Sequence, residues 1–423
     1  MKKIVYNLEF LIETALHIGS GILSPETGAG IIAQNGAGEY YIPGTSFAGL
    51  FFERLWHLNN ENEDDVYNTL MGKVEMENSN ENKKYYNTGS PIVFRSSIIE
   101  KPELMIRDRV KINRKLRTAE YESKFSVWQI NPHIHKEPLI IKAICEIDLS
   151  SFIIDDMRQA SNINKKIDYN IVITTVEKVF NSWNKEGLFI GGYSSSGMGW
   201  ATLKSATKNS ESVLRDDIKK DLPSVFKTWD VILEVKNESD GYGTNGLLIR
   251  GGDEQLSFRY NEGKTNINQS PISEINPQID AVFMHDGKQL FIPGSSLKGA
   301  ISFYLDKYGK TEWLKNLLGQ EKSDVGGKVF FKDLYPTNYK SKHLLTIERH
   351  AEDEFTRAIL GTSKFDEECL FNTTFEGQIR CYANDEKEVG NMIAFIKDLC
   401  DNRMISIGAG SCYPKITIKE KEN

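Results

Sequence analysis

The sequence predicts an α+β fold built from two similar domains in tandem. A chain of 423 residues is longer than one ordinary hydrophobic core requires, and two domains of common size account for it. One short phrase occurs in each half, as YIPGTSFAG at 41–49 and as FIPGSSLKG at 291–299. In each half a strand pattern precedes the phrase, and a helix and a glycine-rich loop follow it in the same order. This repeated order indicates a duplicated α+β unit.

Each half opens with a predicted strand. Apolar and polar residues alternate over 4–12 in the first half, and Val231, Leu233 and Val235 share one face in the second. Both strands run into glycine-containing segments, at 16–21 and at 247–252.

The repeated phrase predicts a phosphate site at the start of a helix. Apolar residues recur at helical spacing after Ser46 and after Ser296. A strand that passes through Pro-Gly into a helix started by serine leaves backbone N–H groups and the positive end of the helix dipole facing outward. The serine hydroxyls can equally serve only as helix caps. The candidate phosphate contacts are Gly44, Thr45, Ser46, Gly49, Gly294, Ser295, Ser296 and Lys298.

Each half closes with a helix and a glycine-rich loop. Apolar stripes over 172–183 and 389–399 predict the helices, and the loops follow at 187–200 and 405–412. Main-chain N–H groups in such loops can hold phosphate without reading base sequence. The candidate contacts are Gly192, Ser194, Gly408 and Gly410, with Tyr193 and Trp200 as candidates for stacking on bases.

The boundary between the halves is predicted at the polar stretch 205–227, as a solvated linker or an exposed helix. This gives a first domain at 1–204 and a second at 228–423. The second half carries an insertion at about 253–277, rich in Asn, Ser, Gln and Glu, which is expected to form a surface loop.

Composition narrows the class of protein. The net charge of −7 argues against a surface coated in positive charge, so any nucleic-acid surface must be a local groove. The five cysteines are scattered and odd in number, which disfavours a disulfide framework or a zinc ribbon and favours a reducing cytoplasm. No apolar run is long enough to span a bilayer, and no signal peptide is recognisable.

With these parts together, nearly the whole chain resembles the RAMP superfamily, specifically the backbone subunits of type III CRISPR effector complexes. The resemblance rests on the two Ile-Pro-Gly phrases, on the glycine-rich loops and on the segment 346–368. That segment is similar to the family's "IDR…FTG…LFDEE" stretch, with Glu348 in place of Asp and Arg357 in place of Gly.

The resemblance implies two tandem ferredoxin-like, RRM-type RAMP domains with inserted thumb and finger segments. It implies a subunit that binds guide RNA (crRNA) by its backbone, presents it to target RNA, and contacts other CRISPR effector subunits, away from membranes. A subunit that serves any guide sequence must contact phosphate and sugar rather than base edges.

The resemblance also implies one catalytic residue. Catalytic family members cleave RNA with an aspartate in the loop before the Ile-Pro-Gly strand, and Asp280 stands at that place. The first half has no acid there, and Glu26 is the nearest carboxylate. The RNA 2′-hydroxyl would be the attacking group. Asp280 would orient a water or a metal ion, either Mg²⁺ or another divalent cation. The alternative is an ordinary loop carboxylate, in which case neither half cleaves.

A basic segment at 107–117 occupies the thumb position of the first half and alternates apolar with charged residues, as on a strand with one charged face. We expect it to contact the RNA backbone. The candidates from this segment and from the histidine-containing segments are Arg107, Arg109, Lys111, Arg114, His285, Arg349 and His350. His285 would assist Asp280, contact phosphate, or lie in a surface turn.

Three functions remain open on the sequence. The first is a guide-binding subunit that cleaves target RNA through Asp280. The second is the same subunit without catalysis, acting as a scaffold. The third is a ribonuclease that processes precursor guide RNA with a histidine such as His17 as general base, although packing or hydrogen bonding is the favoured role for His17.

Overall fold

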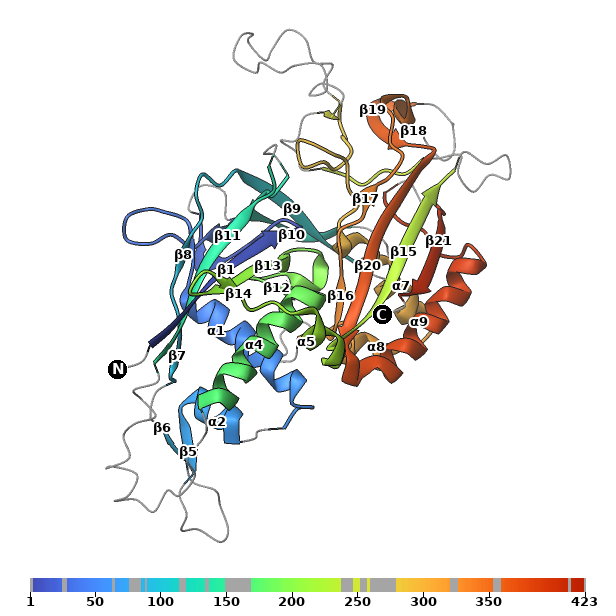
Figure 1. Cartoon of the computed structure of the whole chain (residues 1–423). Helices are drawn as coiled ribbons and strands as arrows, with labels where there is room; N and C mark the ends of the chain where they lie inside the picture. The colour runs from blue at the N-terminus through green and yellow to red at the C-terminus, as the bar shows by residue number, and fades with distance from the viewer. Residues whose placement is uncertain are drawn as a thin grey trace.

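The computed structural model describes residues 3–24, 29–62, 65–75, 85–87, 90–113, 119–133, 137–148, 169–236, 246–251, 257–258, 279–319, 326–352, 359–409 and 412–421. The chain forms two α+β modules that lie side by side, the first drawn in blue to green and the second in yellow to red (Figure 1). We call them the first and the second module.

The first module is built on one antiparallel sheet with the strand order β12-β13-β1-β11-β7. Helices α1 and α4 cover one face of this sheet (Figure 1). Phe47 of α1 and Phe180 of α4 pack with Tyr6 and Phe10 of β1 in one buried cluster. The elements are β1 (Lys3–Ile12), α1 (Gly44–Leu58), β7 (Ile92–Phe94), β11 (Ile140–Asp148), α4 (Tyr169–Glu186), β12 (Leu188–Phe189), β13 (Trp200–Lys208) and β14 (Glu211–Ser212), which pairs antiparallel with the end of β13.

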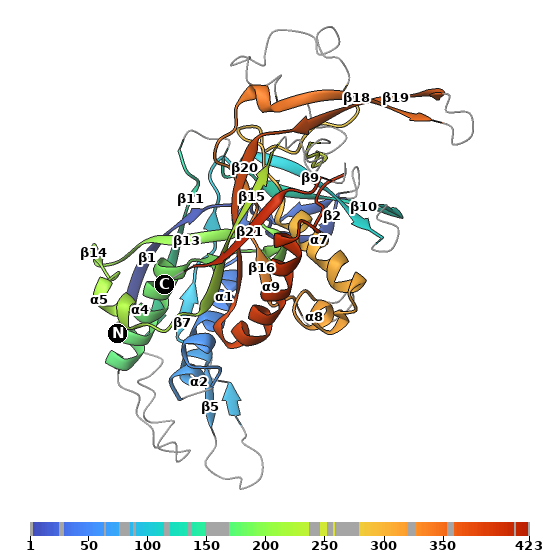
Figure 2. The same cartoon turned by 90° about the vertical axis from the view of Figure 1, so that its right-hand side faces the viewer.

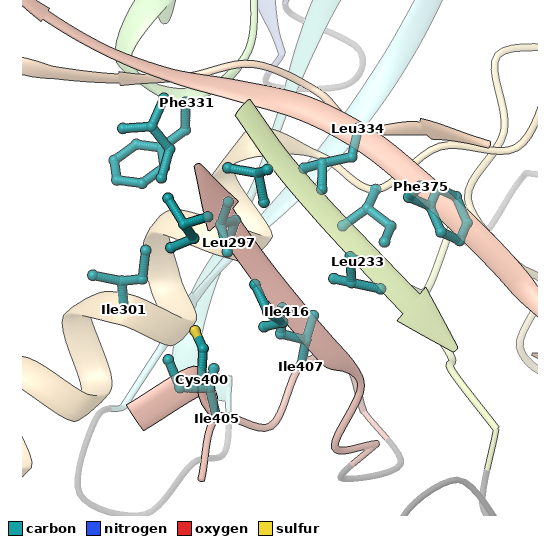
Figure 3. Packing of buried hydrophobic residues seen from close by; sticks show 14 of the residues in the cluster. Leu233, Leu297, Ile301, Phe331, Leu334, Phe375, Cys400, Ile405, Ile407 and Ile416 are labelled. Carbon is teal, nitrogen blue, oxygen red and sulfur yellow. The ribbon is translucent and has the colours of Figure 1, made fainter. Parts of the chain in front are cut away.

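The second module repeats this arrangement with the strand order β16-β20-β15-β21. Leu297 and Ile301 of α7 face Leu233 of β15 and Ile416 of β21 across the core (Figure 3). The elements are β15 (Phe226–Val235), α7 (Gly294–Lys307), α8 (Thr311–Asn316), β16 (Val329–Phe331), β17 (Tyr335–Pro336), β20 (Thr373–Tyr382), α9 (Glu386–Asp401) and β21 (Lys415–Glu420), with short 3-10 turns η3 (Ser341–His343) and η4 (Ala383–Asp385).

Numbered within each module by chain order, both sheets have the order 4-1-3-2, with one helix after the first strand and one after the third. This is the ferredoxin-like topology, so the predicted fold class is confirmed. The apolar alternation of β1 and β15 places every second side chain in the core, as their burial shows.

Each module also carries an extended hairpin. In the first, β9 (Leu104–Ile112) and β10 (Ala119–Ile130) join β2 (Gly19–Leu23) and β3 (Gly30–Ile32) in a second sheet. In the second, β18 (Leu344–Glu352) and β19 (Ile359–Leu370) project from the module as a long arm (Figure 2). The remaining elements of the first module are α2 (Asp65–Met71) and the strand pairs β4 (Tyr41–Ile42) with β8 (Ser97–Ile98) and β5 (Lys73–Glu75) with β6 (Tyr85–Asn87).

The polar stretch between the modules is more structured than a linker. Strand β13 continues to Lys208 and β15 already begins at Phe226, so strand residues occupy both ends of the segment 205–227. Between them lies α5 (Asp216–Asp221), in which no residue is buried. This is the exposed helix that was the alternative to a solvated linker. Of the insertion at about 253–277, only Ser257 and Phe258 lie within the described residues.

Backbone pairing aligns the two modules residue by residue. Phe94 faces Cys145 in the first module and Phe331 faces Ile379 in the second. The carbonyl oxygens of Phe94 and Phe331 also lie about where a Cβ on Gly44 or Gly294 would fall, 2.0 and 2.1 Å away. These two glycines are equivalent, and any side chain at either would collide with a backbone carbonyl.

Candidate nucleic-acid interface

The glycine-rich loop of the first module packs against the helix start of the second. The loop contains the 3-10 turn η2 (Ser194–Ser196) and four glycines with positive φ, Gly187, Gly191, Gly197 and Gly199. A Cβ on Gly197 would collide with the carboxylate of Asp333 and approach the backbone nitrogen of Gly294. The missing side chain therefore lets the two modules approach closely here. Strand β9 completes this junction.

Arg107 of β9 forms a buried ion pair across the junction. Its Nη1 and Nη2 donate to the two carboxylate oxygens of Asp333 at 3.1 and 3.2 Å, and the guanidinium lies over the ring of Phe291. Arg107 is only 2% exposed. The expectation that it contacts RNA is therefore wrong, because a buried bidentate ion pair leaves no face of the guanidinium for a phosphate.

Arg109, two residues further along the same face of β9, is placed differently. Its Nη1 donates to Ser196 Oγ at 3.1 Å, and the guanidinium lies 4.4 Å from the ring centroid of Tyr193. Within the described part of the chain, Nε and Nη2 are buried and have no hydrogen-bond partner. Burial and the nearby Arg107 lower the pKa of Arg109 to about 10, so the group remains a cation at neutral pH. An anion that displaced part of the covering loop would supply the acceptor that these buried N–H groups lack.

Lys298 of α7 approaches the same loop from the second module. Its Nζ donates to Ser195 Oγ at 3.2 Å. The structure therefore brings together Arg109, the loop at Ser194–Ser196 and Lys298, which are predicted contacts from both halves of the sequence. Lys111 lies further along β9, is exposed, and pairs with Glu120 at 3.0 Å.

The two helix starts differ from the prediction and from each other. Both helices begin at the glycine with proline as N-cap, and no side chain caps either helix, so Ser46 and Ser296 do not start them. The N–H of Gly294 donates to Asp333 at 2.7 Å, and that of Gly44 donates to Ser96 at 3.2 Å. A resident carboxylate thus takes the leading N–H of α7, which corrects the expectation that it faces outward to bind phosphate.

The other predicted contacts of these helix starts differ in exposure. Thr45 and Gly49 are exposed on α1, whereas Ser295 and Ser296 are half-buried at the junction.

Asp280 lies at the base of the second module's arm. Its carboxylate is exposed, and Oδ2 accepts the backbone N–H of Asp366 in β19 at 2.8 Å. The adjoining residue Ala281 pairs in parallel with Glu367, as Gly30 does with Val127 in the first module. The equivalent of Asp280 is therefore Ala29, which is fully buried and carries no acid.

The described residues contain no cluster of three His, Cys, Asp or Glu side chains suited to a metal ion. An exposed carboxylate with one engaged oxygen still fits Mg²⁺, since this ion commonly takes one or two carboxylates and completes its shell with water and substrate phosphate.

Two histidines and one tryptophan are too buried for their side chains to contact RNA. His17 is buried, its Nδ1 lies 2.7 Å from the Trp128 carbonyl oxygen, and burial lowers its pKa, which fits the favoured packing role. His285 is buried against Phe258 and its Nδ1 accepts the Gly287 N–H, so it is not a surface turn residue. Trp200 is 1% exposed, and the expectation that it stacks on a base is wrong.

Two glycines that were predicted to contact phosphate pack against backbone carbonyls within the fold. The Gly192 N–H donates to the His17 carbonyl at 2.9 Å, so it is not available to phosphate. Gly408 has a φ of 80° and lies against the Leu248 carbonyl, an approach that only glycine permits.

Four predicted contacts lie partly or wholly outside the described residues. Arg114 and Gly410 are outside them altogether. Arg349 and His350 belong to β18, where they pair with Phe365 and Lys364, but their side chains are not among those described.

The residues that organise the junction were not foreseen from the sequence. Asp333 follows a short edge strand and lies in no recognisable motif. Glu13, which pairs with Lys332 at 2.7 Å across the junction, ends the first strand. A comparison of the two halves offers one signal, because Ser96 stands where the second half has Asp333.

The fold and the junction together define a tandem ferredoxin-like protein in which Arg109 and Lys298 lie beside one glycine-rich loop between its modules. The family model of the RAMP superfamily matches residues 9–202 and 244–416, which is most of the chain, and the protein belongs to this superfamily. Membership supports an RNA-binding, CRISPR-associated role. No curated protein matched the chain. None of the helices in the described part of the chain is both long and apolar enough to cross a membrane.

Proposed function

We propose that the protein is a double-module backbone subunit of a type III CRISPR complex. It binds guide RNA along the junction by its sugar-phosphate backbone, and its second module cleaves complementary target RNA through Asp280. The observation that carries the binding part is Arg109, a cation whose Nε and Nη2 are buried beside the glycine loop without an acceptor, so that RNA would bind as the loop opens and would supply that acceptor. Contacts of this kind attach to phosphate and carry no base preference, which suits a subunit that must accept any guide.

Binding is tested at Arg109 itself. The substitution Arg109→Ala removes one phosphate contact, so we expect guide RNA to bind more weakly. The slope of log K against the logarithm of the salt concentration should also fall in magnitude by about one. The measurement is fluorescence anisotropy with guide RNA at several salt concentrations. The matched control is Lys397→Ala, which removes a cation on the exposed side of α9, far from the junction in sequence and exposed to solvent. Equal salt slopes for the Arg109 variant and the wild type would reject the phosphate contact.

Cleavage is tested at Asp280. The carboxylate would hold a divalent cation, which when bound would stabilise negative charge on the phosphate oxygens, while Asp280 also orients the attacking group. In the assembled complex, Asp280→Asn should lower target RNA cleavage by at least about a hundredfold and leave guide affinity unchanged. Asp401→Asn, at the exposed end of α9, is the control. Undiminished cleavage at the same positions would leave the scaffold function without catalysis.

The processing ribonuclease finds less support in the geometry. His17 is buried, its Nδ1 is engaged by a backbone carbonyl, and its lowered pKa reflects burial rather than an acid partner. Chelator-insensitive cutting of precursor RNA by the isolated chain would favour that function over ours.

A further inference from the structure

The base of the second module's arm carries an ion pair next to Asp280. Arg250 donates from Nη2 to Oε1 of Glu367 at 3.0 Å. Glu367 lies in β19 and forms a β-bridge with Ala281, the neighbour of Asp280 in the chain. Asp366, the residue before Glu367, donates its backbone N–H to the carboxylate of Asp280. Two consecutive residues of β19 therefore hold the Arg250 guanidinium and the Asp280 carboxylate at the same end of the arm.

The two members of this ion pair differ sharply in exposure. The side chain of Glu367 is 6% exposed, whereas that of Arg250 is 60% exposed. A buried carboxylate requires a cation beside it, so Glu367 fixes where the guanidinium of Arg250 lies. A guanidinium has five N–H donors in a planar fork, and more than half of this side chain faces solvent. Arg250 can therefore bind an oxyanion while its ion pair with Glu367 stays in place.

The first module folds in the same way without this ion pair. Its strand registers are the same at this place, so each residue of the second module has a definite equivalent in the first. The equivalents of Arg250, Glu367 and Asp280 are Gly19, Val127 and Ala29. The fold therefore does not require the ion pair. All three charged residues occur together in the module that carries the candidate catalytic acid, and none of them occurs in the other.

The charge around Asp280 is otherwise negative. Asp366 faces Glu348 across the hairpin of β18 and β19, and the side chains of Glu348 and Asp280 are exposed. An RNA phosphate that approached these carboxylates would be repelled unless positive charge compensated for them. Arg250 is a cation that the fold itself holds at this place. Its exposed guanidinium can thus supply part of the positive charge that a phosphate needs beside Asp280.

We propose that Arg250 binds the scissile phosphate of target RNA and stabilises the negative charge that develops on its oxygens, an inference that rests on the proposed cleavage by the second module. In this step the RNA 2′-oxygen forms a bond to phosphorus, and the bond from phosphorus to the 5′-oxygen breaks. The 2′-hydroxyl gives its proton to water and the 5′-oxygen takes one from water, which leaves a 2′,3′-cyclic phosphate and a 5′-hydroxyl. A fixed guanidinium favours the more highly charged transition state. Glu367 is a positioning residue, because it acts on the phosphate only through Arg250.

Cleavage kinetics of the assembled complex separate a phosphate contact from support of the fold. Arg250→Ala should lower kcat for target RNA by about a hundredfold and leave KM nearly unchanged. The double variant Arg250→Ala with Glu367→Val removes the buried charge as well and copies the first module at Val127. Its melting temperature should recover toward that of the wild type, but its kcat should stay as low as that of Arg250→Ala. Arg215→Ala, which breaks an exposed ion pair elsewhere, is the control and should cleave normally.

Sulfur in place of a nonbridging oxygen at the scissile phosphate gives a second measurement. The sulfur weakens a hydrogen bond from a guanidinium, so it should slow the wild type more than Arg250→Ala, which has already lost that contact. A residue that only supports the fold would leave the effect of sulfur the same in both proteins.

Three outcomes overturn the proposal: an unchanged kcat in Arg250→Ala, a kcat that recovers with stability in the double variant, or equal slowing by sulfur in both proteins. Should Arg250→Ala fold poorly by circular dichroism, the double variant carries the kinetic and the sulfur tests. Asp280→Asn keeps this inference distinct from the proposed function. Cleavage lost in Asp280→Asn but retained in Arg250→Ala rejects Arg250 alone. Cleavage retained in Asp280→Asn but slowed in Arg250→Ala rejects the role of Asp280 and still supports the phosphate contact.

Discussion

At the scale of single residues, Arg107 and Arg109 show how neighbouring side chains acquire opposite roles. They lie two positions apart on one face of β9, and their sequence pattern is the same. The difference comes from Asp333 of the second module, because its carboxylate forms an ion pair with Arg107. Arg107 becomes a buried part of the junction, while Arg109 keeps two N–H groups without a partner in the described residues.

Removing the buried cation should therefore cost stability rather than RNA affinity alone. Arg107→Ala leaves Asp333 buried without its cation, and we expect the free energy of unfolding to fall by about 3–5 kcal/mol. Urea denaturation followed by tryptophan fluorescence measures this loss. Arg215→Ala, which breaks the exposed ion pair with Asp217, should leave the unfolding midpoint unchanged. A midpoint for the Arg107 variant equal to that of the wild type would contradict the structural role.

At the scale of elements, the repeated phrase is explained by packing. Proline fixes the entry to the helix, and the following glycine lets the helix start lie against a strand carbonyl. A Cβ on the second glycine of the phrase, Gly49 or Gly299, would have no atom within 4 Å, so packing does not require glycine there. The phrase is thus mainly a packing motif, and within it Lys298 approaches the glycine-rich loop of the first module.

The two glycines of one phrase should respond oppositely to alanine. At Gly44 or Gly294 a methyl group would collide with a carbonyl, so alanine should destabilise the protein by roughly 2 kcal/mol or more. At Gly49 the helix is exposed, and alanine should stabilise it by up to about 1 kcal/mol. Thermal melting of the single variants measures both. Equal melting temperatures for the Gly44 and Gly49 variants would contradict this account.

At the scale of the whole molecule, the two modules behave as one packed body. Phe189 and Trp200 of the first module share a buried cluster with Phe226 and Phe330 of the second. Arg380 reaches across to the Glu186 carbonyl at 2.7 Å, and Arg54 of α1 lies over the ring of Phe226. Unfolding of either module therefore exposes surface of the other.

Three partly buried histidines predict that the free energy of unfolding falls in mild acid. Burial lowers the pKa of His17, His57 and His133 below the value of a free histidine. The unfolded chain then binds more protons than the folded one, so stability is full above a pH of about 6.5 and falls below it, by at most about 1.4 kcal/mol per pH unit for each histidine. Melting temperatures between pH 8 and pH 5.5 measure the decline. His17→Gln should flatten the curve, and a wild-type curve without slope would contradict the prediction.

The sequence by itself determined the duplication, the α+β class and, within each half, the order of the opening strand, the two helices and the glycine-rich loop. It did so because apolar periodicity and Pro-Gly punctuation are local properties of the chain. It also identified Arg109, Lys298 and Asp280 as candidates, and it recognised that the halves are unequal. The roles of these three residues in RNA binding and cleavage stay predictions.

Only the tertiary structure decided which candidates are accessible. Burial of Arg107 and Trp200 depends on a second module brought against the first, and burial of His285 depends on Phe258 from a distant part of its own module. No local sequence pattern encodes contacts between residues so far apart in the chain. The same is true of Asp333, which takes the N–H of Gly294 that the sequence left for phosphate. A charge is available to a ligand only when no residue from elsewhere in the chain has paired with it, and pairing of this kind is a property of the folded chain.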